Sequence, residues 1–154
     1  GVSSPPFVTV QRACAGRTPT NGAFRTWIEA ALRSAQAAPG ALVLRIVDEP
    51  EGAELNQAWR SRSAPTNVMS FPAELSENPE FRVLGDLVLC APVVRREARA
   101  QGKRQAAHWA HLVIHGTLHL LGYDHIVESE AEAMEALECA VLAGLGFPDP
   151  YQTD

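Results

Sequence analysis

The sequence lacks any long hydrophobic segment. Of its 154 residues, 46% are hydrophobic and 20% are charged, yet no apolar run approaches the roughly 20 residues that cross a bilayer. The residues from Gly1 to Pro6 also lack the basic and then apolar pattern of a secretory signal. We therefore expect residues 1–154 to form a single domain, without membrane contact and located in the cytoplasm.

Cysteine is scarce, and its spacing excludes two classes of site. Cys14, Cys90 and Cys139 are odd in number and far apart, so they form no C-x-x-C pair for metal binding or redox chemistry. We expect them to be reduced, core-type residues. The sequence also contains no internal repeat and no low-complexity linker, which again favours one domain.

Positively charged residues are in the minority, and the net charge is −5. This argues against a protein that binds nucleic acid non-specifically over its whole surface. The average conceals an asymmetry, because a basic segment within residues 95–104 is opposed only by Glu97 and comprises Arg95, Arg96, Arg99, Lys103 and Arg104. An acidic segment follows later, with Glu128, Glu130, Glu132, Glu135 and Glu138. The basic segment is either a phosphate-contacting surface or an ordinary solvated helix face. No aromatic series is interleaved with it, so sequence-specific base reading is not supported.

Hydrophobic periodicity predicts alternating strands and helices. Strands are expected at 7–12, 41–47, 67–71 and 84–90, and helices at 24–35, 48–59, from Pro92 through 104, at 106–121, and from a capping box at Ser129 to about 145. The nearly all-apolar strand 41–47 is typical of one covered on both faces, and the polar stretch 74–82 should be mobile. The order predicts an α+β or mixed α/β domain with helix 106–121 against the sheet.

All five histidines lie between positions 108 and 125. His115 and His119 are four residues apart and so project from one helix face toward a common point. Gly122 can adopt the left-handed conformation that ends a helix, which would let His125 approach that point from a third direction. Three imidazoles with an open fourth position are typical of a catalytic zinc, so we expect one Zn²⁺ per chain.

The spacing is that of the zinc-protease motif H-E-x-x-H-x-x-G-x-x-H, except that Gly116 replaces the general-base glutamate. Any hydrolysis must therefore activate water without a carboxylate at that position. Spacing alone also allows His111 and His115 as the ligand pair, and His111 or Asp124 could instead orient a ligand. Core or surface histidines without a metal are the remaining alternative.

Several short blocks of the sequence resemble those of one known family, and they occur in the same order along the chain. They are Glu54-Leu55-Asn56, Arg60, the run from Pro65 to Pro72, Leu84-Gly85-Asp86-Leu87, and the histidine segment 115–125. Together they resemble the YbeY family, bacterial single-domain metalloproteins regarded as endoribonucleases, over residues 40 to 145. The resemblance implies a small mixed four-stranded sheet packed with about five helices, zinc on His115, His119 and His125, and Arg60 lining the cleft.

The resemblance further implies a function on the ribosome. The expected activity is metal-dependent endonucleolytic cleavage of single-stranded RNA in 3′-end maturation of 16S-type ribosomal RNA and in ribosome quality control. The partners would be ribosomal RNA and the small ribosomal subunit, with a ribosome-assembly GTPase as a further candidate. Arg60 would stabilise the phosphate charge, while Arg62, Arg95, Arg96, Arg99 and Lys103 are candidate RNA contacts. The alternatives are a zinc metallopeptidase-like hydrolase and a non-catalytic, metal-stabilised RNA-binding module of the ribosome.

Overall fold

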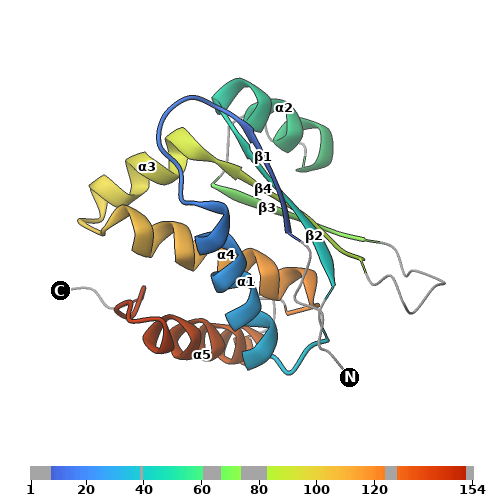
Figure 1. Cartoon of the computed structure of the whole chain (residues 1–154), viewed down its shortest axis with the longest axis vertical. Coiled ribbons are helices and arrows are strands. Elements are labelled where there is room, and N and C mark those ends of the chain that lie inside the picture. The colour runs from blue at the N-terminus through green and yellow to red at the C-terminus, as the bar shows by residue number, and fades with distance from the viewer. Residues whose placement is uncertain (1–7, 39, 61–66, 74–82, 124–127, 152–154) are drawn as a thin grey trace.

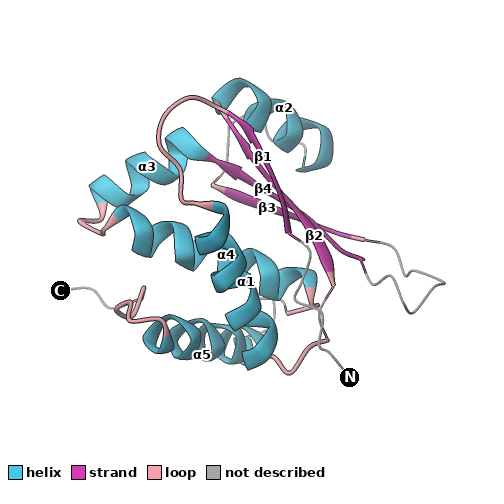
Figure 2. Cartoon of the chain, in the orientation of Figure 1, coloured by secondary structure: helices cyan, strands magenta, loops and turns pink. Residues whose placement is uncertain are grey.

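The computed structural model describes residues 8–38, 40–60, 67–73, 83–123 and 128–151, and for residues 59 and 60 it describes the backbone only. Within these ranges the chain forms four strands and five helices (Figures 1 and 2). In chain order they are β1 (Val8–Ala13), α1 (Asn21–Ser34), β2 (Ala41–Val47), α2 (Glu49–Arg60), β3 (Val68–Pro72), β4 (Val83–Cys90), α3 (Ala91–Ala100), α4 (Gln105–Leu120) and α5 (Glu128–Gly144). The α+β prediction is confirmed.

The four strands form one mixed sheet in the order β1-β2-β4-β3. β2 pairs in parallel with both β1 and β4, whereas β3 is antiparallel to β4 at the opposite edge. Parallel neighbours need crossover connections, and these are supplied by α1 between β1 and β2 and by the segment containing α2 and β3 between β2 and β4.

The helices cover the two faces of the sheet unequally. Figure 1 shows α2 on one side and α1, α4 and α5 on the other. The larger core lies under α1, α4 and α5 and includes Leu42, Leu44 and Ile46 of β2, all at most 1% exposed. The smaller core lies near α2, where Leu55 packs against a buried cluster that includes Met69 and Val88. Each apolar face thus has its own helical cover.

Two local predictions need correction. Strand 41–47 is covered along one whole face, but on its second face only Val47 is fully buried, because Val43 and Arg45 are only partly buried and Arg45 forms a salt bridge with Glu51. The basic helix ends at Ala100, since Gly102 adopts a φ of +64° and separates α3 from α4. Lys103 and Arg104 therefore lie in the connection. No described helix combines the length and hydropathy needed to cross a membrane.

Candidate metal centre

Helix α4 carries the histidines and lies very close to the sheet. Gly116 makes this possible, because a Cβ at this position would lie 2.8 Å from Leu87 Cδ2 and 3.3 Å from Ser70 Oγ. Ser70 Oγ in turn donates a hydrogen bond to the Gly116 carbonyl at 3.1 Å. The position equivalent to the protease glutamate therefore faces β3 and β4, and a glutamate side chain has no room there.

The expected pair, His115 and His119, does converge. Their Nε2 atoms lie 3.1 Å apart, with the ring planes at 77°. Two imidazole nitrogens on one tetrahedral zinc, each about 2.0–2.1 Å from the ion, would be roughly 3.3 Å apart. The pair thus fits a shared zinc with only a small adjustment.

The other nitrogen of His115 is held by Glu138 of α5. His115 Nδ1 donates to Glu138 Oε1 in a short hydrogen bond, and the Glu138 side chain is fully buried. With the proton on Nδ1, the Nε2 lone pair of the neutral ring is directed toward His119. A carboxylate that orients a histidine in this way is a common feature of metal sites, because it fixes the tautomer and raises ligand basicity.

Tyr151 and His111 complete the contacts of Glu138. The Tyr151 hydroxyl donates to Glu138 Oε2 in a short hydrogen bond, and His111 Nε2 lies 3.5 Å from the same oxygen and 3.3 Å from the hydroxyl. Burial raises the pKa of Glu138, but the hydrogen bonds from His111, His115 and Tyr151 outweigh it and lower that pKa to about 2. Burial and the neighbouring Glu138 together raise the pKa of Tyr151. Glu138 is therefore a stably charged carboxylate within the core.

A second metal geometry also exists in the described part of the chain. One ligand atom from each of His111, His115 and Glu138 falls within 4.8 Å of the others. An ion there would have to displace the Tyr151 hydroxyl and compete for His115 Nδ1, which already has a hydrogen-bond partner. We therefore favour the His115 and His119 Nε2 atoms as the metal-binding pair, with Glu138 in the orienting role.

The turn after α4 has the predicted form. Gly122 has a φ of +101°, Gly122 N–H donates to His119 O at 3.0 Å, and Tyr123 N–H donates to Leu118 O at 3.1 Å. These two bonds form a glycine-terminated helix end, as the sequence predicted. Asp124 and His125 lie outside the described residues, as does Arg62, and only the backbone of Arg60 is described, at the end of α2.

Sequence reasoning missed the role of Glu138 and counted it only as one residue of the acidic segment that follows the histidines. The signal was its register, because Glu138 follows Met134 by four residues and precedes Val141 and Leu142 by three and four, so it lies within the buried stripe of α5. A carboxylate at a core position needs partners, and the histidine-rich helix could supply them.

The candidate RNA contacts in the basic segment have different environments. Arg95 donates to the carbonyls of Ala15 and Arg17, and Arg96 pairs with Glu49 at 2.9 Å in an exposed ion pair. Lys103 Nζ donates to Pro150 O at 2.9 Å. The Arg99 side chain is exposed and makes no hydrogen bond or ion pair within the described residues.

Comparison with known proteins identifies the family of the chain. A sequence model described as Endoribonuclease YbeY matches residues 14–146. Curated proteins named Endoribonuclease YbeY are similar to the chain: that of Pseudomonas entomophila is 56% identical over 94% of this chain and 92% of its own length. The protein of Methylococcus capsulatus is 54% identical over 94% of this chain and 95% of its own length.

A solved structure shares the fold. The solution structure of TM1509 from Thermotoga maritima matches with a TM-score of 0.59 and 23% identity, over 95% of this chain and 99% of that one. The likeness to that structure concerns the fold alone, whereas the family match spans most of the chain at high identity. On the sequence match, the histidine-bearing chain described here belongs to the YbeY family.

Proposed function

We propose that the chain is a metal-dependent endoribonuclease with zinc bound by His115, His119 and His125. The observation that carries the proposal is the convergence of the His115 and His119 Nε2 atoms at 3.1 Å, with buried Glu138 orienting His115. The relatives that match most of the chain are named endoribonucleases, which supports RNA as the substrate.

In the proposed phosphodiester hydrolysis, the metal ligands, Glu138 and Arg60 have different roles. A zinc on three imidazoles would supply a water whose pKa is about 7, so that hydroxide is available at neutral pH. Glu138 keeps His115 in the tautomer that can bind the metal through Nε2. In this proposal His111 and Asp124 help to orient the metal ligands. Arg60, at the end of α2, would place a permanently charged guanidinium at the phosphate, where negative charge develops. Arg62 would assist it.

In the cell, the proposed substrate is single-stranded ribosomal RNA, cleaved during 3′-end maturation of 16S-type RNA and in ribosome quality control. The proposed setting is the cytoplasm, with the small ribosomal subunit and a ribosome-assembly GTPase as partners. The resemblance of the sequence blocks to the YbeY family supports this assignment.

The packing at Gly116 argues against the metallopeptidase alternative. A general-base glutamate at position 116 would collide with Leu87, Ser70 and Val68 rather than reach a metal-bound substrate. Peptide hydrolysis that is sensitive to a chelator would nevertheless favour the peptidase. RNA binding without cleavage by zinc-loaded wild-type protein would favour the non-catalytic binding module.

The direct test measures metal content and cleavage of a single-stranded RNA in identically purified variants. We expect His119→Ala to lose both zinc and cleavage, and Arg60→Glu to retain zinc and lose cleavage. Arg33→Glu, which changes an exposed arginine of α1, serves as the charge-matched control and should behave as wild type. Cleavage at the wild-type rate by His119→Ala would contradict the proposal.

A further inference from the structure

A groove distinct from the histidine cluster lies between the β1–α1 connection and helices α1, α3 and α4. Its volume is about 670 Å³, within the range of small-ligand sites. The floor is apolar and consists of Ala23, Trp27, Ala106 and Trp109. The rim carries Arg17, Arg95 and Arg99, and the lining is completed by Thr18, Pro19, Thr20 and Gln105.

The positive charge of this arginine groove is not neutralised locally. No carboxylate is among the described residues that line it. Arg95 is held by the carbonyls of Ala15 and Arg17, which are neutral, and the Arg99 side chain has no partner within the described residues. Helices α1 and α4 both begin at the groove and have no acidic residue in the first turn, so their N-terminal dipoles add to the positive potential.

Arg12 fixes the β1–α1 connection, which forms one wall of the groove. Arg12 donates to Thr18 Oγ1 at 2.8 Å, to Asn21 Oδ1 at 2.6 Å and to the Pro19 carbonyl at 2.6 Å. These three bonds fix the β1–α1 connection against the start of α1. A preformed wall reduces the entropy lost when a ligand binds.

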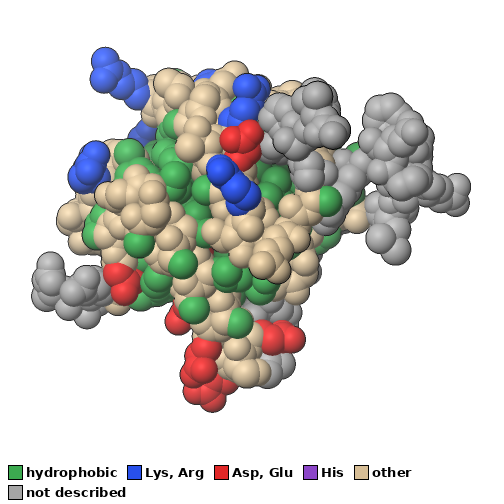
Figure 3. Space-filling model, turned by 60° about the horizontal axis from the view of Figure 1, so that its bottom comes forward, with side chains coloured by type: hydrophobic (Ala, Val, Ile, Leu, Met, Phe, Trp, Pro, Cys, Tyr) green, Lys and Arg blue, Asp and Glu red, His purple; other side chains and the backbone are tan. Residues whose placement is uncertain are grey.

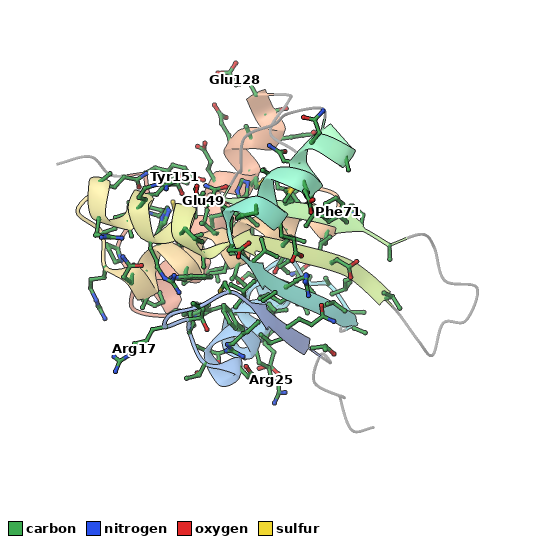
Figure 4. The ribbon with its side chains drawn as sticks, turned by 90° about the horizontal axis from the view of Figure 1, so that it is seen from above. Arg17, Arg25, Glu49, Phe71, Glu128 and Tyr151 are labelled. Atoms are coloured by element: carbon green, nitrogen blue, oxygen red, sulfur yellow. The ribbon has the colours of Figure 1, made fainter. Side chains whose placement is uncertain are left out.

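The groove and the metal centre are on different parts of α4. His115 follows Trp109 by six residues, which corresponds to about 9 Å along the helix axis and about 120° around it. Figure 4 shows Arg17 well apart from Tyr151, which contacts Glu138 in the metal centre. In the face shown in Figure 3, most of the Lys and Arg side chains lie in the upper half and most of the Asp and Glu side chains in the lower half.

We propose that the arginine groove binds a segment of single-stranded RNA outside the cleavage site, with phosphates at Arg17, Arg95 and Arg99. Guanidinium groups match phosphate oxygens in a bidentate manner, and a base can cover the apolar floor. Trp27 and Trp109 are only 6% and 2% exposed, so neither offers an open ring face for stacking, and the base contact is an apolar one that reads no hydrogen-bonding edge. An RNA strand supplies both features in every nucleotide, which an acidic peptide does not. This inference rests on the proposed endoribonuclease function.

The test measures binding of a labelled single-stranded oligouridylate by chelator-treated full-length protein, so that cleavage is prevented. We expect Arg99→Glu and Arg17→Glu each to weaken binding on the order of tenfold, and to reduce the slope of log K against log salt by about one. Both arginines are exposed, so folding should be unaffected, which is checked by circular dichroism and by the zinc content of the same variants before chelator treatment. Arg33→Glu makes the same charge change outside the groove and should leave affinity within about twofold.

Equal weakening by Arg33→Glu and Arg99→Glu would overturn the inference, because it would mean that only net charge matters. Tighter binding of a tryptophan-containing polyglutamate peptide than of RNA would also overturn it and indicate a protein partner. If zinc-loaded Arg99→Glu cleaves RNA with an unchanged KM, the groove fails while the proposed function stands. If the variants lose RNA binding as expected but zinc-loaded wild type never cleaves, the groove stands and the proposed function fails.

Discussion

Glu138 is fully buried, yet its pKa of about 2 keeps it charged at neutral pH. Its hydrogen-bond partners come from α4 and from the segment after α5, so one carboxylate joins three parts of the chain. Removal of any of these partners leaves the buried negative charge of Glu138 less well compensated, which lowers the stability of the folded state.

We expect Glu138→Gln to weaken zinc binding by 10- to 100-fold, the usual range for groups that orient a metal-ligating histidine. The amide oxygen can still accept from His115, but the negative charge that raises ligand basicity is lost. Tyr151→Phe should have a smaller effect in the same direction. Competition with a chromophoric chelator measures both affinities. Glu135→Gln, at an exposed position of the same helix, is the control, and equal affinities in all four proteins would refute the role of Glu138.

His108 gives a pH-dependent prediction. It is 3% exposed, and burial lowers its pKa even though Glu97 Oε1, 3.0 Å from His108 Nε2, acts in the opposite direction. Because the folded pKa lies below the unfolded value of about 6.5, protonation favours the unfolded chain. His108 thus contributes its full stability above pH 6.5 and loses it as the pH falls toward the folded pKa.

We expect the free energy of unfolding of chelator-treated wild type to fall more steeply between pH 7 and pH 5 than that of His108→Gln. Urea titrations at several pH values measure this difference. The other ionisable groups are the same in both proteins, so their contributions largely cancel. Parallel pH profiles would show that His108 does not contribute.

At the scale of elements, the contact between α4 and the sheet depends on the absence of a side chain at Gly116. We expect Gly116→Ala to lower the free energy of unfolding by about 1 kcal/mol, because overpacking of 1–3 kcal/mol exceeds the helix-propensity gain of about 1 kcal/mol. Gly144→Ala is the matched control, since a Cβ at position 144 would have no atom within 4 Å, and it should be neutral or stabilising. Thermal or urea unfolding compares them, and a stabilised Gly116→Ala would mean that the sheet can relax.

The order and type of all nine described elements could be predicted from periodicity and turn residues, because these are local properties of the sequence. The turn at Gly122 could be predicted for the same reason. The end of α3 could not, since Gly102 lies within a continuous basic segment yet adopts a positive φ. The start of α5 also differs: its first described residue is Glu128, so Ser129 of the expected capping box lies within the helix.

At the scale of the whole molecule, only part of the site could be predicted from the sequence. The pairing of His115 with His119 follows from spacing on one helix, whereas the contacts of Glu138 and Tyr151 depend on how α5 packs against α4. The arginine groove likewise combines residues from the β1–α1 connection, α1, α3 and α4. Tertiary proximity of this kind has no local sequence signal.

Metal removal should affect the stability of the entire domain. A ligand that binds only the folded state stabilises it by about 2.7 kcal/mol at 100 times its Kd, which for a domain of this size corresponds to roughly 5–10 °C in Tm. We therefore expect saturating zinc to raise the Tm of chelated wild type by that amount. Differential scanning calorimetry measures the shift, and His119→Ala should show almost none. A similar rise in both proteins would place the stabilising zinc elsewhere.

The central position of β2 also affects how the chain folds. Its parallel partner β4 follows only after α2 and β3, so β2 is a sheet edge until a long loop has closed. Contacts so distant in sequence slow folding, and an unpaired apolar edge is prone to aggregation in the meantime. During synthesis from the N-terminus, the sheet therefore completes only after β4 has emerged. Glu138 and Tyr151 follow later still, so the metal centre is expected to mature last.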